Sequence, residues 1–121
     1  MAECKVNSIK TMWQLWTLKQ KLTWFFKNKC RLGRKEIENY KIGIIHGYGH
    51  PNKLIDLVTE IFKNDNVNLI IFGHSHSALN EKRGNIIYFN PGSPTDKTFA
   101  LHNSYGIIEI NDKIEAKIVR I

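Results

Sequence analysis

The stretch Asn68-Leu69-Ile70-Ile71-Phe72-Gly73-His74-Ser75-His76 decides the fold of this 121-residue chain. Four consecutive apolar residues, two of them β-branched, predict a strand over residues 67–72 that is buried on both faces. Gly73 then releases the backbone into a turn that carries two histidines one residue apart. We therefore expect the chemistry of the chain to lie at the carboxyl end of this strand.

A second strand of the same design is predicted over residues 41–46. Its apolar run ends in His46-Gly47-Tyr48-Gly49-His50, and Pro51 then suits the first turn of a helix that continues to about residue 64. A strand, a helix and a strand in this order predict two parallel strands with a right-handed crossover. Parallel strands deliver His46, His74 and His76 to one edge of the sheet, which is where open α/β sheets bind ligands.

The remainder of the chain predicts two antiparallel hairpins. Residues 78–80 and 86–89 flank a polar loop at 82–85, and residues 105–110 and 114–121 flank a turn at 111–113 with alternating apolar and polar side chains. The expected fold is therefore mixed α/β with an antiparallel tail.

Size and composition predict one soluble domain with a modest core. The two cysteines, Cys4 and Cys30, are too few for a disulfide framework and lack zinc-knuckle spacing. No apolar run approaches the ~20 residues that span a bilayer, and nothing resembles a signal peptide. A cytoplasmic location is the expectation.

The first part of the chain is strongly basic. Residues 1–40 hold nine Lys or Arg residues and three acidic ones, and so contribute +6 of the net charge of +7. Apolar side chains recur there at helical spacing with lysines between them, which predicts a basic amphipathic helix of roughly five turns. That helix can pack on the rest of the domain, or its lysines can contact a membrane surface or nucleic acid. Both interpretations stay open.

Three histidines raise the hypothesis of a metal site. Neutral imidazole is a general ligand for zinc, manganese, iron and cobalt, but His-x-His alone is weak support. The repetition of an apolar strand followed by histidine strengthens it, whereas the alternative is that His46, His74 and His76 cap their strands and bond to nearby backbone. His50 is a candidate for a further ligand or a substrate contact.

Three motifs resemble one protein family. Ile44-Ile-His-Gly-Tyr-Gly, then Ile71-Phe-Gly-His-Ser-His, then Tyr88-Phe-Asn-Pro-Gly-Ser are similar to the last motifs of the calcineurin-like metallophosphoesterases. The closest branch holds the small YfcE-like and archaeal phosphodiesterases together with a non-catalytic retromer sorting subunit. The resemblance covers residues 36–121 and implies the carboxyl-terminal half of an αββα sandwich.

The resemblance also implies a hydrolase site. His46 would ligate one metal of a two-metal pair, and His74 and His76 would complete the pair. A supporting loop would lie beside it, formed by Gly73, Asn90, Gly92 and Ser93. The implied cofactors are divalent ions (Mn, Ni, Zn or Mg), and the implied reaction is hydrolysis of a phosphate ester by metal-activated water.

The family's amino-terminal motifs, which supply aspartates to the metals, are missing. Residues 1–35 contain no aspartate and no histidine. Two divalent ions held only by neutral imidazoles would repel each other, so we expect at most one metal from this chain alone. Activity would then require carboxylates from a partner chain or from a homodimer.

Residues 1–35 therefore form an atypical, Trp-rich segment, separate from the phosphoesterase portion at 36–121. One hypothesis is a shifted reading frame up to about Gly33. If Met12-Trp13-Gln14-Leu15-Trp16 is encoded ATG TGG CAA TTG TGG, reading one base later gives Cys-Gly-Asn-Cys, which resembles the family's Gly-Asn-Cys-Asp motif. The nucleotide sequence decides this hypothesis.

Three function classes follow. The first is a truncated or degenerate metal-dependent phosphodiesterase, the second is a non-catalytic metal-binding or protein-interaction module of the same fold, and the third is a basic module that binds anionic lipid or nucleic acid. Binding to phosphates weakens steeply as salt rises, which would identify the third class.

Overall fold

The computed structural model describes residues 3–5, 32–93, 96–98, 100–110 and 112–121. The basic amphipathic helix expected in the first part of the chain lies outside these residues. Within them the fold is the mixed α/β arrangement that the sequence predicts, with one α-helix and two sheets.

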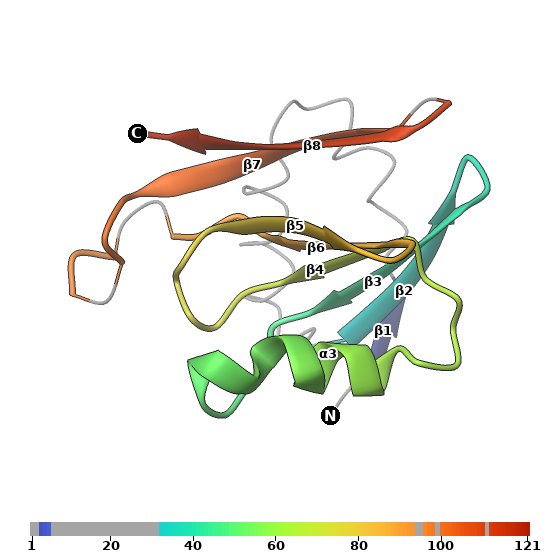
Figure 1. The fold of residues 1–121 in the computed structure, drawn as a ribbon, viewed down its shortest axis with the longest axis horizontal. Helices are drawn as coiled ribbons and strands as arrows, with labels where there is room; N and C mark the ends of the chain where they lie inside the picture. The colour runs from blue at the N-terminus through green and yellow to red at the C-terminus, as the bar shows by residue number, and fades with distance from the viewer. Residues whose placement is uncertain (1–2, 6–31, 94–95, 99, 111) are drawn as a thin grey trace.

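A six-stranded mixed sheet forms the centre of the molecule, with strand order β1-β2-β3-β4-β6-β5 (Figure 1). Parallel pairing joins β1 to β2, β3 to β4 and β4 to β6, and antiparallel pairing joins β2 to β3 and β5 to β6. The strands are β1 (Glu3–Lys5), β2 (Leu32–Ile37), β3 (Tyr40–Ile45), β4 (Leu69–Phe72), β5 (Leu79–Arg83) and β6 (Ile86–Asn90).

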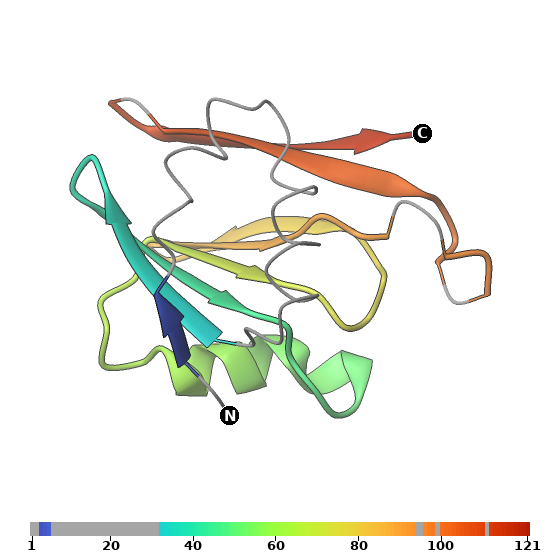
Figure 2. The same cartoon turned by 180° about the vertical axis from the view of Figure 1, so that it is seen from behind.

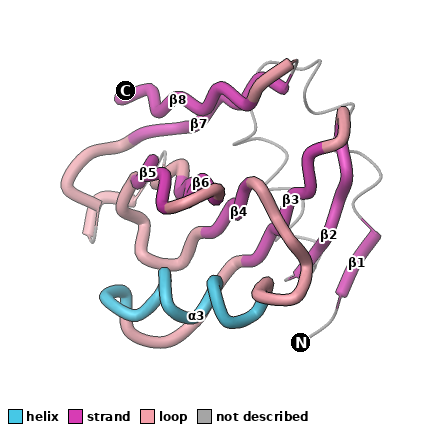
Figure 3. Tube along the Cα trace, turned by 45° about the vertical axis from the view of Figure 1, so that its right-hand side comes forward, coloured by secondary structure: helices cyan, strands magenta, loops and turns pink. Residues whose placement is uncertain are grey.

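The predicted strand-helix-strand unit is confirmed, with different helix boundaries. Pro51 begins a short 3-10 helix, η1 (Pro51–Lys53), and α3 (Leu54–Ile61) follows it (Figure 3). Lys53 lies outside the α-helical region (φ −108°, ψ 6°), so η1 and α3 are separate elements. The helix ends three residues before the predicted position, because the backbone of Phe62 leaves the α-helical region (φ −101°, ψ 11°).

Strand β4 is buried at all four positions, as a strand covered on both faces must be. Its register with β3 pairs Ile42 with Leu69 and Ile45 with Phe72. The two strands therefore end side by side. Their parallel pairing confirms the arrangement predicted from the two histidine-bearing stretches.

Both predicted hairpins are present, and a third was not predicted. The β5–β6 loop consists of Gly84 and Asn85 alone, because Arg83 and Ile86 already pair. The second hairpin joins β7 (Ser104–Ile110) to β8 (Ile114–Arg120) as a separate two-stranded sheet. The unpredicted hairpin joins β2 to β3 through Glu38 and Asn39, which both have positive φ, as two-residue hairpin turns of type I′ require.

The six-stranded sheet has a different cover on each face. Helix α3 lies against one face and the β7–β8 sheet against the other, as Figures 1 and 2 show from opposite sides. Alternation along the strands divides the core accordingly. Facing α3 are Ile45, Ile70, Phe72 and Tyr88 with the helix residues Leu54, Val58 and Phe62; facing the β7–β8 sheet are Ile42, Ile44, Leu69, Ile71 and Phe89 with Ile108 and Ile110.

A close approach fixes one glycine on the helix side. A Cβ built on Gly43 would lie 2.7 Å from the ring of Phe62, so a larger residue there would displace the ring. In the part of the chain that the structure describes, no helix is long and apolar enough to cross a membrane.

Candidate functional site

The candidate site lies where β3 and β4 end together. The N–H of Gly73 donates to the carbonyl of His46 at 3.0 Å, which continues the pairing of the two strands by one step. The rings of His46 and His74 consequently meet edge to face, with centroids 5.6 Å apart and an interplanar angle of 73°. The sequence-based expectation that the two strand ends bring histidines together is met by this pair.

Backbone carbonyls orient both rings. His46 Nδ1 lies 2.9 Å from the carbonyl oxygen of Gly47, and His74 Nε2 lies 2.8 Å from that of Gly49. A carbonyl only accepts, so the donors must be Nδ1–H in His46 and Nε2–H in His74. When the two imidazoles are neutral they are thus different tautomers, and the loop between β3 and η1, which carries the two glycines, sets both.

His76 is oriented differently, by a carboxylate. Its Nδ1 lies 2.6 Å from Oδ2 of Asp96, which comes from the loop between β6 and β7. The Asp96 side chain is 11% exposed, whereas that of His76 is 44% exposed. Asp96 is 20 residues from His76 in a polar loop without periodicity, and sequence reasoning did not identify it.

The turn that carries the histidines is strained. The N–H of Ser75 bonds to the carbonyl of Gly73 at 2.9 Å, a γ-turn pattern with His74 at its centre and φ of 72°. His76 also has positive φ, at 59°. Left-handed backbone costs an L-residue about 1–2 kcal/mol, and such strain concentrates at functional sites.

Asn90 holds this turn in place. It is 1% exposed, and its Nδ2 donates to the carbonyl of Gly73 at 3.2 Å and to Oγ of Ser75 at 3.1 Å. Its Oδ1 accepts the N–H of Gly92 at 2.9 Å. Asn90 thereby connects the end of β6 to the histidine turn, the position that the family resemblance implies for a supporting residue.

The rest of the supporting loop packs against β7. Gly92 has φ of 78°, and a Cβ there would collide with Oγ of Ser104. Ser104 is 1% exposed and donates through Oγ to the carbonyl of Pro91. Ser93 is also buried, and its carbonyl accepts from the N–H of Ser104 at 3.1 Å. The loop is therefore fixed at both ends.

His50 follows Gly49, the carbonyl partner of His74, and lies immediately before η1. Its Nδ1 accepts the N–H of Asn52 at 3.1 Å, so the ring caps the 3-10 helix and carries its proton on Nε2 when neutral. The side chain is exposed. Its proposed contact with substrate stays a prediction.

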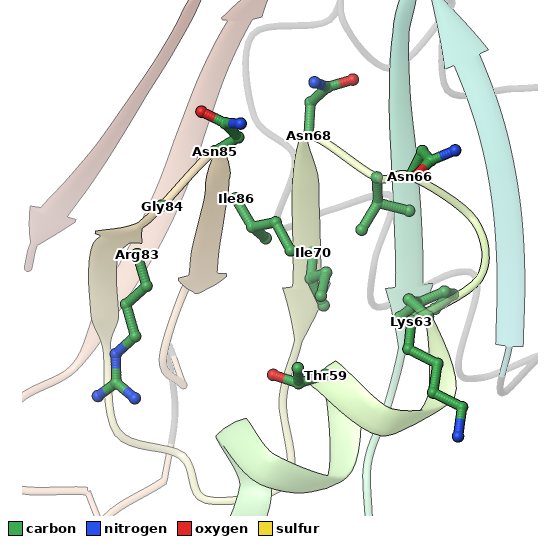
Figure 4. A pocket seen from close by; sticks show the side chains of 11 residues that line it. Thr59, Lys63, Asn66, Asn68, Ile70, Arg83, Gly84, Asn85 and Ile86 are labelled. Carbon is green, nitrogen blue, oxygen red and sulfur yellow. The ribbon is translucent and has the colours of Figure 1, made fainter.

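Two cavities lie at opposite ends of strands β4, β5 and β6. One of about 310 Å³ adjoins the histidine turn and is lined in part by Ser75, Ser77 and Asn90. A larger cavity of about 620 Å³ lies between the end of α3 and the β5–β6 turn, with Ile70 and Ile86 toward its floor and Lys63 and Arg83 at its rim (Figure 4). No histidine is among the residues that line either cavity, so the candidate site is identified by the histidine pair and not by cavity volume.

Imidazole is a common metal ligand, but His46, His74 and His76 do not form a complete metal site. Among the residues that the structure describes, no three His, Cys, Asp or Glu side chains converge as metal ligands. Their arrangement is a pair of neighbouring rings, His46 and His74, with His76 held against Asp96. Further ligands are needed before these residues could bind a metal as the family does.

Comparison with known proteins connects this geometry to a family. The sequence profile of the calcineurin-like phosphoesterase superfamily domain matches residues 24–113. A probable metallophosphoesterase of Methanocaldococcus jannaschii is 35% identical over 89 residues, which is 71% of this chain and 45% of that protein. The chain thus spans less than half the length of this relative.

Solved structures share the fold. A novel archaeal phosphodiesterase superposes with a TM-score of 0.60 at 21% identity, covering 86% of this chain and 60% of that one. Vps29 of Entamoeba histolytica complexed with zinc superposes with a TM-score of 0.53 at 22% identity, covering 75% and 61%. At these identities the likeness shows the fold alone.

Proposed function

Since the chain belongs to the calcineurin-like phosphoesterase superfamily, we propose that it carries the histidine half of a metal-dependent phosphoesterase site that hydrolyses phosphate esters. The observation that carries this proposal is the pairing of His46 and His74 at the shared carboxyl ends of β3 and β4, with ring centroids 5.6 Å apart. Open sheets with parallel strands bind ligands at this edge.

The described residues would act by binding and orienting. The carbonyls of Gly47 and Gly49 fix the imidazoles of His46 and His74, and Asn90 fixes the turn that follows β4. When bound, divalent metals supply activation of water and neutralisation of charge on the phosphoryl oxygens. Because the imidazoles are already oriented, the site would not need to reorganise at the moment of reaction.

A complete site needs carboxylate ligands that the described part of the chain does not bring to His46 and His74. Residues 1–35 contain no aspartate, and Asp96 is engaged with His76. We propose that carboxylate ligands are supplied by another chain, for which a homodimer is the simplest source. Manganese, nickel, zinc and magnesium are the candidate ions, and zinc is the ion named for the Entamoeba histolytica relative of the same fold.

A non-catalytic binding module of the same fold is the second candidate. One observation favours it: the described residues bring no three metal-ligating side chains together. In this case the sheet edge that carries His46 and His74 would bind a partner protein or a single metal ion without hydrolysing a substrate.

The experiment that separates the candidates is hydrolysis of bis-p-nitrophenyl phosphate by metal-stripped protein after addition of Mn²⁺, Ni²⁺, Zn²⁺ or Mg²⁺. The phosphoesterase proposal predicts metal-dependent turnover that His74→Ala abolishes. His102→Ala is the matched control, because His102 is exposed in the loop before β7. Absence of turnover with every ion, in protein shown to be folded, would reject catalysis by this chain and support the binding module.

A further inference from the structure

We propose that Asp96 is a positioning residue. It holds His76 as the Nδ1–H tautomer and turns Nε2 toward the ligand that binds at the carboxyl ends of β3 and β4, the edge that carries His46 and His74. The proposal rests on the proposed function only in assigning His76 to that edge. The contact itself is a hydrogen bond of 2.6 Å between His76 Nδ1 and Asp96 Oδ2.

The carboxylate defines which nitrogen carries the proton. An ionised carboxylate only accepts, so His76 Nδ1 must be the donor and Nε2 is left with its lone pair when the ring is neutral. A carboxylate behind a histidine fixes the tautomer and the direction of the ring, which is how proteins orient imidazole toward a metal.

The carboxylate is itself fixed by backbone donors. Oδ1 accepts the N–H of Thr98 at 2.8 Å, and Oδ2 accepts the N–H of Ala100 at 3.1 Å as well as the imidazole. Rotation of the side chain would break these bonds together. Asp96 therefore presents Oδ2 to His76 in one orientation.

The loop that carries Asp96 is anchored to its neighbours. The N–H of Asp96 donates to Oγ of Ser93, and Nδ2 of Asn103 donates to the carbonyls of both Ser93 and Asp96. Ser93 and Asn103 also form an isolated parallel bridge. The carboxylate is thus connected to the supporting loop on one side and to the start of β7 on the other.

Exposure gives the pair a direction. Asp96 is 11% exposed at its side chain and His76 is 44% exposed. A pair that only stabilised the fold could use either ring nitrogen of the histidine, and either of its two partners could be the exposed one. Here the buried partner is the carboxylate and the accessible partner is the imidazole, on a residue that the turn holds at φ of 59°.

Nuclear magnetic resonance of the ring nitrogens tests the proposal without substrate or metal. Long-range ¹H–¹⁵N spectra, at a pH where the ring carries one proton, should show the Nδ1–H tautomer for His76 in the wild-type protein. Asp96→Ala removes the acceptor, so nothing then holds the proton on Nδ1 and His76 should shift toward the Nε2–H tautomer. Asp56→Ala is the control, since Asp56 is exposed on α3.

An Nε2–H tautomer in the wild-type protein would overturn the proposal, and so would an unchanged tautomer in folded Asp96→Ala. If Asp96→Ala does not fold, the wild-type spectrum still decides whether His76 is the Nδ1–H tautomer. Titration with Zn²⁺ alone adds a second readout: affinity should fall about 10–100-fold in Asp96→Ala and stay constant in Asp56→Ala. Wild-type protein that binds no Zn²⁺ would remove the proposed function while leaving the tautomer result intact.

Discussion

Replacement of Asn90 by alanine should destabilise the protein through the histidine turn. Asn90 is 1% exposed and makes three hydrogen bonds, to the carbonyl of Gly73, to Oγ of Ser75 and from the N–H of Gly92. Truncation leaves the N–H of Gly92 without this acceptor, whereas the carbonyl of Gly73 still accepts the N–H of Ser75. An unsatisfied polar group inside a protein costs about 1–3 kcal/mol, so we expect a loss of about 1–3 kcal/mol.

Asn90→Asp separates hydrogen bonding from volume. The carboxylate has nearly the size of the amide and can still accept from Gly92, but it turns an oxygen toward the carbonyl of Gly73. A buried charge facing an acceptor should cost at least as much as truncation. If packing alone fixed the turn, the aspartate would be tolerated.

Urea denaturation followed by circular dichroism measures both effects. With a slope of about 2 kcal/mol per molar urea, the expected loss lowers the midpoint by about 0.5–1.5 M. Asn64→Ala is the control, because Asn64 is exposed and surface substitutions stay within about 0.5 kcal/mol. A midpoint for Asn90→Ala or Asn90→Asp equal to that of Asn64→Ala would refute the reasoning.

Three further substitutions test the packing by their unfolding free energies in urea. Gly43→Ala should cost about 1–3 kcal/mol, because its Cβ would lie 2.7 Å from the Phe62 ring; no loss would show that the ring moves freely. Gly92→Ala combines a clash with φ of 78° and should cost more than Gly43→Ala, so the reverse order would contradict the strain argument. Tyr88→Phe removes the 2.7 Å bond to the Thr59 hydroxyl and should cost about 1 kcal/mol, an effect that should vanish in a Thr59→Val background.

The meeting of His46 and His74 at the ends of two neighbouring strands could be predicted from sequence because its signal is local. Apolar runs that end in histidine, separated by a helix with an apolar stripe, predict parallel strands that end together. The register of Ile45 with Phe72 then places His46 beside Gly73, as the structure shows. Periodicity and strand order were sufficient for this part of the site.

Strand β2 could not be found in the same way. Only Gly33 and Ile37 of its six residues are buried, and charged side chains occupy the positions between them. The pattern lacks the apolar alternation that marks a strand, and its hairpin turn uses Glu38 and Asn39 in place of a glycine. Pairing with β3, rather than local propensity, makes this segment a strand.

The contact between Asp96 and His76 is also invisible in sequence. It joins two loops 20 residues apart, and the loop of Asp96 is ordered by hydrogen bonds from Ser93 and Asn103 rather than by apolar periodicity. Likewise, the choice of ring nitrogen in His46 and His74 depends on the carbonyls of a glycine-rich loop. Tautomers follow from three-dimensional contacts that spacing does not encode.

Metal stoichiometry by calorimetric titration tests the central claim most directly. If the chain carries the histidine half of a phosphoesterase site, wild-type protein at concentrations where it is monomeric should bind at most one Zn²⁺ or Mn²⁺ per chain. His74→Ala should abolish that binding and His102→Ala should preserve it. Two ions bound per monomer, or binding unchanged in His74→Ala, would contradict the account.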